Sequence, residues 1–340
     1  MSEILEQNIR KILSEIHNPI TNHSIVNDIS KIIIQDKTIT FAIYTEKDTA
    51  QEALKLREIC IKKLAQLPEI EKATISITSR SAEEKPIENK KKPVQGVRKI
   101  ILVASGKGGV GKSTIAVNLA ISLSKLGKKV GIVDTDIYGP SIPTLLDINK
   151  KPALEDNMMI PILKYGIKAM SIGLLVEEKE PLIWRGPMTT KMLFQLIRMT
   201  KWNFDGEELD YLIVDSPPGT GDVHLSLAEN YKIDGAIIVT LPQELSVKDA
   251  RKSLAMCQKL EIPIIGIVEN MSFVAETGVP LFGKGGAKKL AKEFSTNVLA
   301  NIPIYQDLAI CSDMGKPLTY SDSKHEVSKI FNSLASEIAK

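Results

Sequence analysis

Cysteine is scarce in this chain of 340 residues, and its three copies, Cys60, Cys257 and Cys311, lie far apart. No Cys-x-x-Cys pair occurs, so the sequence indicates neither a disulfide framework nor a local zinc site. Each thiol is therefore predicted to be a small buried apolar residue rather than a ligand. The four histidines also lack the spacing of metal ligands.

Long apolar runs and a strong charge imbalance are also missing. No stretch reaches the roughly 18 apolar residues typical of a membrane-spanning helix, and the polar first eight residues do not resemble a signal peptide. The net charge of +3 is too small to indicate a surface for nucleic acid or an anionic membrane. We therefore expect a cytoplasmic protein that binds neither.

A polar segment divides the chain, whose length predicts about two domains. Residues 80–97 have no apolar periodicity and contain Pro86 and Pro93, which is typical of a flexible linker. Lys90, Lys91 and Lys92 within it are interpreted as a solvated charge run rather than as a site for an anionic partner. The linker predicts domains at residues 1–79 and 98–340.

The segment before the linker is predicted to be a small α+β domain without a catalytic constellation. Its pattern indicates a helix reaching Ile16, strands at 29–34 and 38–44 around a turn at 35–37, a helix at 50–67 and a strand at 73–77. By itself this domain would be a binding or scaffolding unit.

Strands and helices alternate after the linker. Buried-strand patterns occur at 100–104, 129–133, 211–214, 236–240, 264–268 and near 298–299. Such alternation predicts an α/β fold with a mostly parallel sheet covered by helices on both faces, and ligands at the carboxyl ends of the strands. The apolar spacing of residues 327–338 predicts a helix, and core packing is favoured over membrane binding.

The most informative segment is a glycine-rich loop between a predicted strand and a predicted helix. Residues 106–113 read Gly-Lys-Gly-Gly-Val-Gly-Lys-Ser, which matches the phosphate-binding pattern G-x-x-x-x-G-K-[ST]. Lys112 is expected to bridge the β- and γ-phosphates and Ser113 to bind Mg²⁺, while Lys107 adds a second positive charge. The predicted nucleotide-binding residues of this segment are Gly106, Lys107, Gly108, Gly109, Val110, Gly111, Lys112, Ser113 and Thr114.

Carboxylates follow two later strands at the same edge of the predicted sheet. Of Asp134 and Asp136, one can hold Mg²⁺ through water while the other orients the attacking water. Asp215 follows the next buried strand and is placed for the Mg²⁺ shell. The chain turns sharply after it, and residues 219–222 could move with the γ-phosphate. His224 beyond them is interpreted as structural rather than as a base.

Two further motifs are less specific. Asn270, at a third strand end, offers both a donor and an acceptor, which suits the edge of adenine. Trp184 and Arg185 suit either a subunit contact or local packing, and the sequence does not separate these alternatives.

Together, five motifs closely resemble the Mrp/ApbC family of iron–sulfur cluster carrier ATPases, within the deviant-Walker class that includes MinD and ParA. They span roughly residues 98–320, and the segment before the linker is similar to the small metal–sulfur cluster assembly domain often fused to such proteins. The motifs are Gly-Lys-Gly-Gly-Val-Gly-Lys-Ser (106–113), Asp-x-Asp-Ile-Tyr-Gly-Pro-Ser (134–141), Trp-Arg-Gly-Pro-Met (184–188), Asp-x-Pro-Pro-Gly-Thr-Gly-Asp (215–222) and Glu-Asn-Met-Ser (269–272).

The resemblance implies a homodimer that slowly hydrolyses ATP with Mg²⁺ and transfers iron–sulfur clusters to apoproteins, working with assembly factors. Lys107 would reach across the dimer to the partner's phosphates, with Lys112 and Asp136 as further catalytic residues. Asp136 would orient water and Asp215 would be the Walker B aspartate. The predicted magnesium residues are Ser113, Asp134 and Asp215. Asn270 would contact adenine.

One departure from the family pattern bears on the cargo. Many members place Cys-x-x-Cys after Glu-Asn-Met-Ser, whereas residues 273–280 contain no cysteine, and neither do residues 44–50 of the first domain. Because thiolates are the expected cluster ligands, the sequence leaves a second interpretation open. It is a nucleotide-switched regulatory or scaffolding ATPase that holds no cluster itself. A membrane- or DNA-partitioning ATPase is disfavoured by the mild charge and by the motifs at 134–141 and 184–188.

Overall fold

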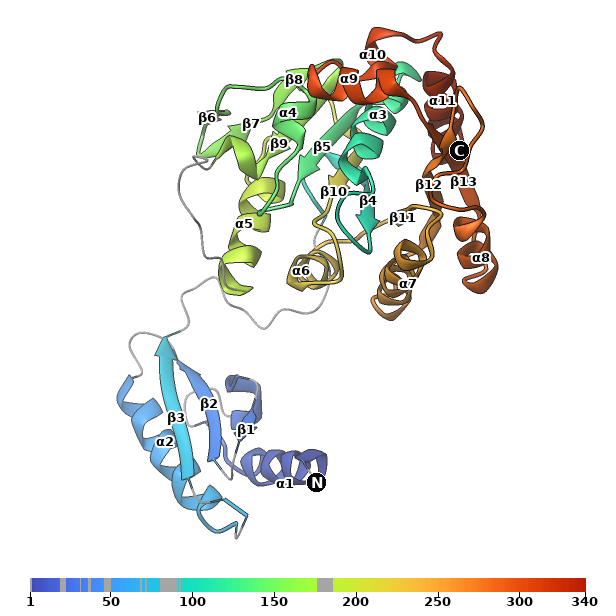
Figure 1. Ribbon diagram of the computed structural model, residues 1–340. Coiled ribbons are helices and arrows are strands. Elements are labelled where there is room, and N and C mark those ends of the chain that lie inside the picture. Colours follow the sequence, from blue (N-terminus) through green and yellow to red (C-terminus); the bar gives the residue numbers. More distant parts are fainter. Residues whose placement is uncertain are drawn as a thin grey trace. The chain divides into compact units, whose positions relative to one another are not determined.

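The computed structural model describes residues 2–18, 23–30, 32–35, 38–45, 50–67, 69–70, 72–79, 91, 93–175 and 186–340 (Figure 1). The chain divides into two compact units, Met1–Lys90 and Lys91–Lys340. Trp184 and Arg185 lie outside the described residues, as does most of the predicted linker.

The first unit is a three-stranded sheet with two α-helices. The strand order is β1-β2-β3, with β1 antiparallel and β3 parallel to β2. Residues from both helices and from β2 and β3 form one apolar core that includes Leu13, Phe41 and Cys60. The elements are α1 (Ser2–Ser14), a 3-10 turn η1 (Ile25–Asp28), β1 (Ile33–Gln35), β2 (Thr38–Thr45), α2 (Ala50–Leu64) and β3 (Lys72–Ser79).

The predicted strand at 29–34 is largely wrong. Residues 25–28 form η1, Ile29 makes only an isolated bridge to Ile43, and β1 begins at Ile33. The amide of Ala42 donates to the Ser30 hydroxyl at 2.9 Å. A side chain thus takes a position that a carbonyl would hold in a regular ladder, which interrupts the strand. Two residues of the predicted turn, 36 and 37, are outside the described part of the chain.

The second unit is built on one large sheet. Its strand order is β13-β12-β11-β4-β10-β5-β9-β8, and every neighbouring pair is parallel except β8 and β9. The elements are β4 (Val97–Ser105), α3 (Lys112–Lys125), β5 (Val130–Asp134), α4 (Ile142–Leu145), β6 (Ala153–Glu155), β7 (Met158–Ile160), β8 (Ile162–Lys164), β9 (Ile167–Ser171), η3 (Ile172–Leu174), α5 (Gly186–Arg198), β10 (Leu209–Asp215), α6 (Asp222–Asn230), β11 (Gly235–Thr240), α7 (Glu244–Lys259), β12 (Ile264–Val274), α8 (Gly286–Glu293), β13 (Val298–Ile304), α9 (Gln306–Asp313), α10 (Leu318–Ser321) and α11 (Glu326–Ile338).

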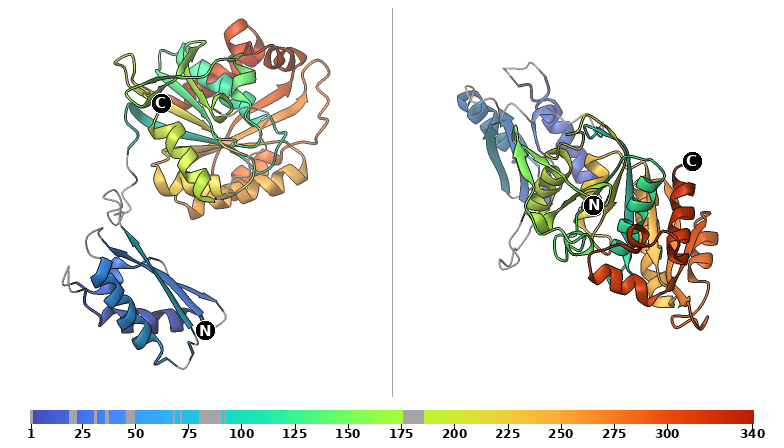
Figure 2. Two further views of the ribbon diagram at one scale, coloured as in Figure 1. Left: turned by 90° about the vertical axis from the view of Figure 1, so that its left-hand side faces the viewer. Right: turned by 90° about the horizontal axis from the view of Figure 1, so that it is seen from above.

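Helices cover both faces of this sheet, as the sequence predicts (Figures 1 and 2). Alternate side chains of the central strand β4 enter different cores, because successive residues of a strand point to opposite faces. Ile101 and Val103 pack with α3 and α11, whereas Ile100 and Leu102 pack with α5, α6, α7 and α8. The sheet is therefore buried on both sides, and its polar groups gather at the strand ends.

Strands β8 and β9 were not predicted. They form a tight hairpin around Tyr165 and Gly166, both of which have positive φ, 51° and 79°. Such a turn is typical of a two-residue hairpin loop. Because β8 is only three residues long, it carries too little alternation to be recognised from the sequence.

The C-terminal helix α11 belongs to the core, which confirms the preferred interpretation. Val327 and Phe331 are fully buried and belong to the same core as α3. In the part of the chain that the structure describes, no helix is both long and apolar enough to span a bilayer.

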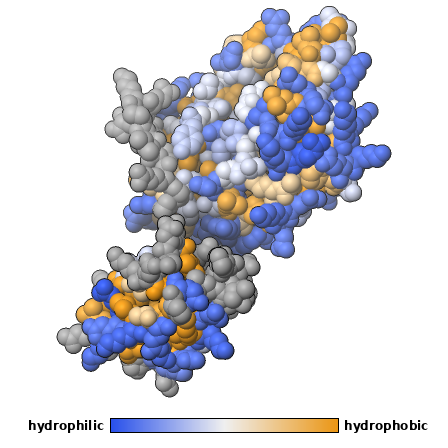
Figure 3. Space-filling view, turned by 60° about the horizontal axis from the view of Figure 1, so that its bottom comes forward, coloured by the Kyte–Doolittle hydropathy of each residue, from blue (hydrophilic) through white to orange (hydrophobic). Residues whose placement is uncertain are grey.

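Hydrophobic residues lie interspersed with hydrophilic ones on the face drawn in Figure 3.

Candidate nucleotide site

The glycine-rich loop lies between the carboxyl end of β4 and the first turn of α3, and it lines a cavity of about 530 Å³. This volume lies within the range of small-molecule sites. The loop leads directly into the N-terminus of α3, and the free N–H groups at a helix N-terminus favour phosphate. The lining residues are Ser105, Lys107, Gly108, Gly109, Val110, Gly111, Lys112, Ser113, Thr114, Asp136, Gly139, Pro140, Ser141, Thr144, Leu145, Pro218, Ser312 and Asp313.

Gly106 is held against a neighbouring helix rather than facing the cavity. A Cβ at this position would lie 2.1 Å from the backbone carbon of Asp249 in α7, far inside normal contact. Only glycine allows this approach. The phosphate-binding pattern requires glycine here, but nothing in the pattern indicates that contact with α7 is the reason.

Asn270 supports the same loop from β12. Its Nδ2 donates to the carbonyl of Val110 at 2.8 Å, and the side chain is buried. Gly111 has a φ of 81°, and a Cβ there would lie 2.3 Å from Asn270 Nδ2. Asn270 thus fixes the loop conformation in this structure. Its predicted contact with adenine stays a prediction.

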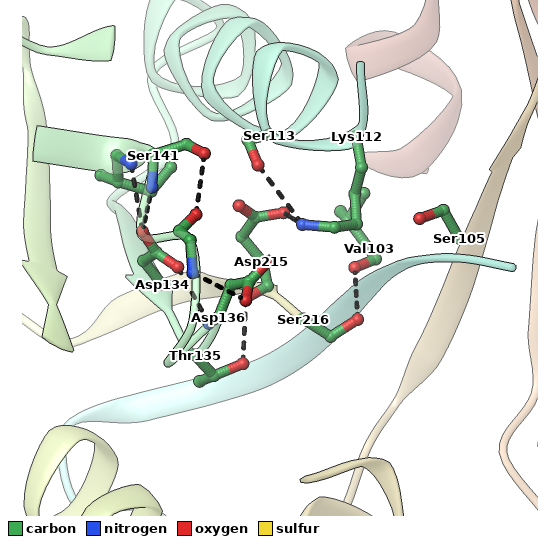
Figure 4. Close-up of polar contacts among 12 residues, drawn as sticks. Val103, Ser105, Lys112, Ser113, Asp134, Thr135, Asp136, Ser141, Asp215 and Ser216 are labelled. Atoms are coloured by element: carbon green, nitrogen blue, oxygen red, sulfur yellow. Dashed lines mark hydrogen bonds and ion pairs between the residues drawn. The ribbon is translucent and has the colours of Figure 1, made fainter. Parts of the chain in front are cut away.

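Lys112 and Asp215 form a buried ion pair beneath the cavity (Figure 4). Lys112 Nζ lies 2.5 Å from Asp215 Oδ1 and 3.3 Å from the Ser113 hydroxyl. Burial raises the pKa of the Asp215 carboxyl, and the positive charge of Lys112 opposes that rise. Asp215 Oδ2 is buried and has no hydrogen-bond partner among the described residues. The structure therefore brings Lys112, Ser113 and Asp215 together, as predicted.

Asp134 is fully buried and anchors the loop that follows β5. Its carboxylate accepts hydrogen bonds from the amides of Asp136, Ser141 and Ile142 at 3.0, 2.9 and 3.1 Å, and from the Ser171 hydroxyl at 3.1 Å (Figure 4). Burial and the neighbouring Asp215 raise its pKa to about 7, against the lowering effect of these amides. Asp134 does not line the cavity, so its predicted magnesium role stays a prediction.

Asp136 and Lys107, in contrast, both line the cavity. Asp136 Oδ1 accepts a hydrogen bond from the amide of Gly139 at 3.3 Å. Lys107 is half-buried, and no described residue forms a hydrogen bond or ion pair with its Nζ. These positions suit a water-orienting carboxylate and a lysine that acts outside its own loop.

Several supporting residues were missed by the sequence reasoning. Thr135 donates from both its amide and its hydroxyl to the Asp215 carbonyl, each at 2.9 Å, which ties β5 to β10. Ser312 and Asp313 at the end of α9 line the cavity, although nothing in their local sequence indicates it. The position of Thr135 between Asp134 and Asp136 was the only feature of the sequence that could have indicated its role.

The model of a ParA family described as NUBPL iron-transfer P-loop NTPase matches residues 96–339. The chain belongs to this family. It is 44% identical to the iron-sulfur cluster carrier protein of Rickettsia conorii over 312 residues, which covers 91% of this chain and 94% of the relative.

Solved structures agree with this membership. A nucleotide-binding protein of Archaeoglobus fulgidus in complex with ADP is 39% identical, with a TM-score of 0.57, and the match covers 67% of this chain and 90% of that one. The MinD ATPase of Pyrococcus furiosus, at 22% identity and a TM-score of 0.53 over 71% and 98% of the two chains, shows the same fold.

The thiols of this family member are poorly placed for a cluster. Cys60 and Cys257 are fully buried, as predicted, and burial raises the pKa of each to about 11. Cys311 is only partly buried, which corrects the prediction for that residue. Over the described ranges, no group of three or more His, Cys, Asp or Glu side chains could hold a metal ion.

Proposed function

We propose that the second unit binds and hydrolyses ATP with Mg²⁺. The observation that carries this proposal is the ion pair of Lys112 and Asp215 beneath a cavity whose wall is the glycine-rich loop. Lys112 is 7% exposed and Asp215 is 0% exposed. Because burying two charges is costly, we infer that the pair is kept for a ligand that uses both.

The residues present suit a magnesium ion. The hard oxygens that Mg²⁺ prefers are supplied by the Ser113 hydroxyl and by Asp215 Oδ2, which no described residue satisfies. Asp134 would act through water, because its oxygens already accept four hydrogen bonds. When bound, the ion would neutralise charge on the phosphates.

Hydrolysis is assigned to three side chains. Asp136 orients the attacking water at the cavity wall, and Lys112 holds the β- and γ-phosphates. Lys107 acts in trans on the phosphates of a second copy, in the manner of an arginine finger. Lys107 lines the cavity and its Nζ has no partner among the described residues, which supports this assignment and, with it, a homodimer.

We also propose that ATP use serves the transfer of iron–sulfur clusters, as cargo, to apoproteins. This part rests on the family and on the carrier named in Rickettsia conorii. Thiolates are the usual cluster ligands, and only Cys311 has any solvent access here. The cluster ligands of this chain are therefore not assigned, and the alternative of a nucleotide-switched regulatory or scaffolding ATPase is kept.

Anaerobic reconstitution with iron and sulfide distinguishes a cluster carrier from a regulatory or scaffolding ATPase. The full chain is incubated with both, desalted, and assayed for visible absorbance, iron per dimer and ATP hydrolysis. A carrier retains iron and sulfide and passes them to an apoprotein. A dimer that hydrolyses ATP but retains no cluster would leave the regulatory alternative, whereas absence of nucleotide binding would overturn the ATPase proposal itself.

A further inference from the structure

His224 is a buried side chain that the proposed hydrolysis does not use. It lies in the first turn of α6 and is 1% exposed. Its Nε2 lies 3.0 Å from the hydroxyl oxygen of Ser216, the residue after Asp215. The imidazole therefore connects α6 to the end of the strand that carries the proposed magnesium ligand.

Ser216 in turn is bound to the central strand. Its hydroxyl and its amide both donate to the carbonyl of Val103, at 3.0 and 3.2 Å. Since the single hydroxyl proton is directed to Val103, His224 Nε2–H is the donor to Ser216. Burial and the nearby charge of Lys112 lower the pKa of His224 to about 4, against a raising effect of the Gly221 backbone. The ring is therefore neutral at pH 7, and with Nε2 protonated, Nδ1 carries the lone pair.

Within the described part of the chain, few other hydrogen bonds hold the segment between Ser216 and Gly219. Pro217 and Pro218 have no N–H to donate, and the next anchor is the amide of Gly219, which donates to Ser105 at 2.8 Å. Pro218 lines the nucleotide cavity. The position of this cavity wall thus depends on its two ends, of which Ser216 is one.

The other ring nitrogen shows that packing alone does not explain the histidine. His224 Nδ1 is buried without a hydrogen-bond partner among the described residues. An unsatisfied buried polar atom lowers stability, and an apolar side chain of similar size would avoid that loss. Packing alone therefore does not account for a histidine at this position.

We propose that His224 is a positioning residue for ATP hydrolysis, which holds Ser216, and with it the Asp215–Gly219 segment, in the geometry that the transition state requires. The inference rests on the proposed ATPase function. The imidazole touches no substrate and transfers no proton. It acts only through the Nε2–Ser216 hydrogen bond.

Four variants of the full chain test this role: His224→Leu, His224→Gln, Ser216→Ala and the double variant His224→Leu/Ser216→Ala. In His224→Leu, loss of the one positioning hydrogen bond is expected to lower kcat about tenfold, with KM for ATP and the thermal midpoint close to the parent. Ser216→Ala also loses the hydroxyl bond to Val103 and should lose at least as much kcat. His224→Gln should recover most of the rate, because its amide N–H can take the place of Nε2–H. The double variant should lose no more than Ser216→Ala alone, because Ser216→Ala already removes the bond to His224 together with the hydroxyl bond to Val103.

Parental kcat in His224→Leu, or losses that multiply in the double variant, overturns the positioning role. If His224→Leu does not fold, Ser216→Ala decides: parental kcat there overturns the role as well. If the parent and these variants bind and hydrolyse ATP equally well, only this inference is refuted. A parent that binds no nucleotide refutes the proposed function.

Discussion

Lys112 Nζ lies 2.5 Å from Asp215 Oδ1 in a pocket where both side chains are almost completely buried. The lysine expected to meet phosphate is thus held by the carboxylate expected to meet magnesium. Binding of Mg–ATP would have to replace this ion pair by two new ones, between Lys112 and phosphate and between Asp215 and the magnesium ion. The charges of the ligand and of the site would then compensate each other.

Asp215→Asn is expected to destabilise the nucleotide-free protein by about 3 kcal/mol, because it leaves the Lys112 charge buried without its partner. Urea unfolding monitored by circular dichroism measures the change. The matched control is Glu244→Gln, which breaks the exposed pair of Lys289 and Glu244 at 3.5 Å and should cost less than about 0.5 kcal/mol. Equal effects of the two variants would contradict the buried-pair account.

Lys107→Ala should lower ATP hydrolysis by about a hundredfold or more, as loss of a finger-type cation does, while ATP affinity stays close to the parent. Single-turnover hydrolysis and equilibrium binding of a fluorescent ATP analogue measure the two quantities. Lys252→Ala, which removes an exposed lysine paired with Asp249, is the control. Hydrolysis by Lys107→Ala at the parental rate would exclude the trans role.

Gly106→Ala is expected to destabilise the second unit by more than about 2 kcal/mol, since the added methyl group would overlap the backbone of α7. Gly108→Ala is the matched control, because its Cβ would meet only Pro218 Cγ at 3.9 Å. Chemical unfolding without nucleotide compares them. If both variants unfold alike, the close approach of Gly106 to α7 does not exist in solution.

Thiol reactivity should distinguish Cys311 from the other two cysteines. Burial raises the pKa of Cys60 and Cys257 to about 11, so both remain protonated below that pH and react slowly in the folded protein. At pH 8, Ellman's reagent should label about one thiol per chain quickly and all three after denaturation. Cys311→Ser should abolish the fast phase, and a persisting fast phase would show that a buried thiol is reached.

The layout of the second unit was predictable because its strands are buried on both faces and its loops carry specific motifs. Apolar runs such as 100–104 and 211–214 are typical of buried strands and fit few other structures. The first lies within the observed β4 and the second within the observed β10. Short elements such as β8 depend on pairing with β9, and Ser30 disrupts a strand that its neighbours favour. Such effects arise from tertiary contacts, which local periodicity does not record.

The candidate site divides in the same way. The roles predicted for Lys112, Ser113 and Asp215 depend on a motif whose geometry is local to strand ends, and the three side chains do meet. The donors around Asp134, by contrast, come from three later segments of the chain and include Ser171 on β9. The local sequence of a strand end therefore does not distinguish a carboxylate that faces a ligand from one that accepts hydrogen bonds from its own loop.

The contact between Gly106 and α7 gives the phosphate loop a mechanical connection to a surface helix. With no free space at this point, the loop has no room to shift toward Asp249 without displacing the helix. A movement of the loop on filling or emptying the cavity would then change the path of α7, whose Leu245 is largely exposed near its start. Slower amide exchange along α7 with ADP than without it would record that transmission.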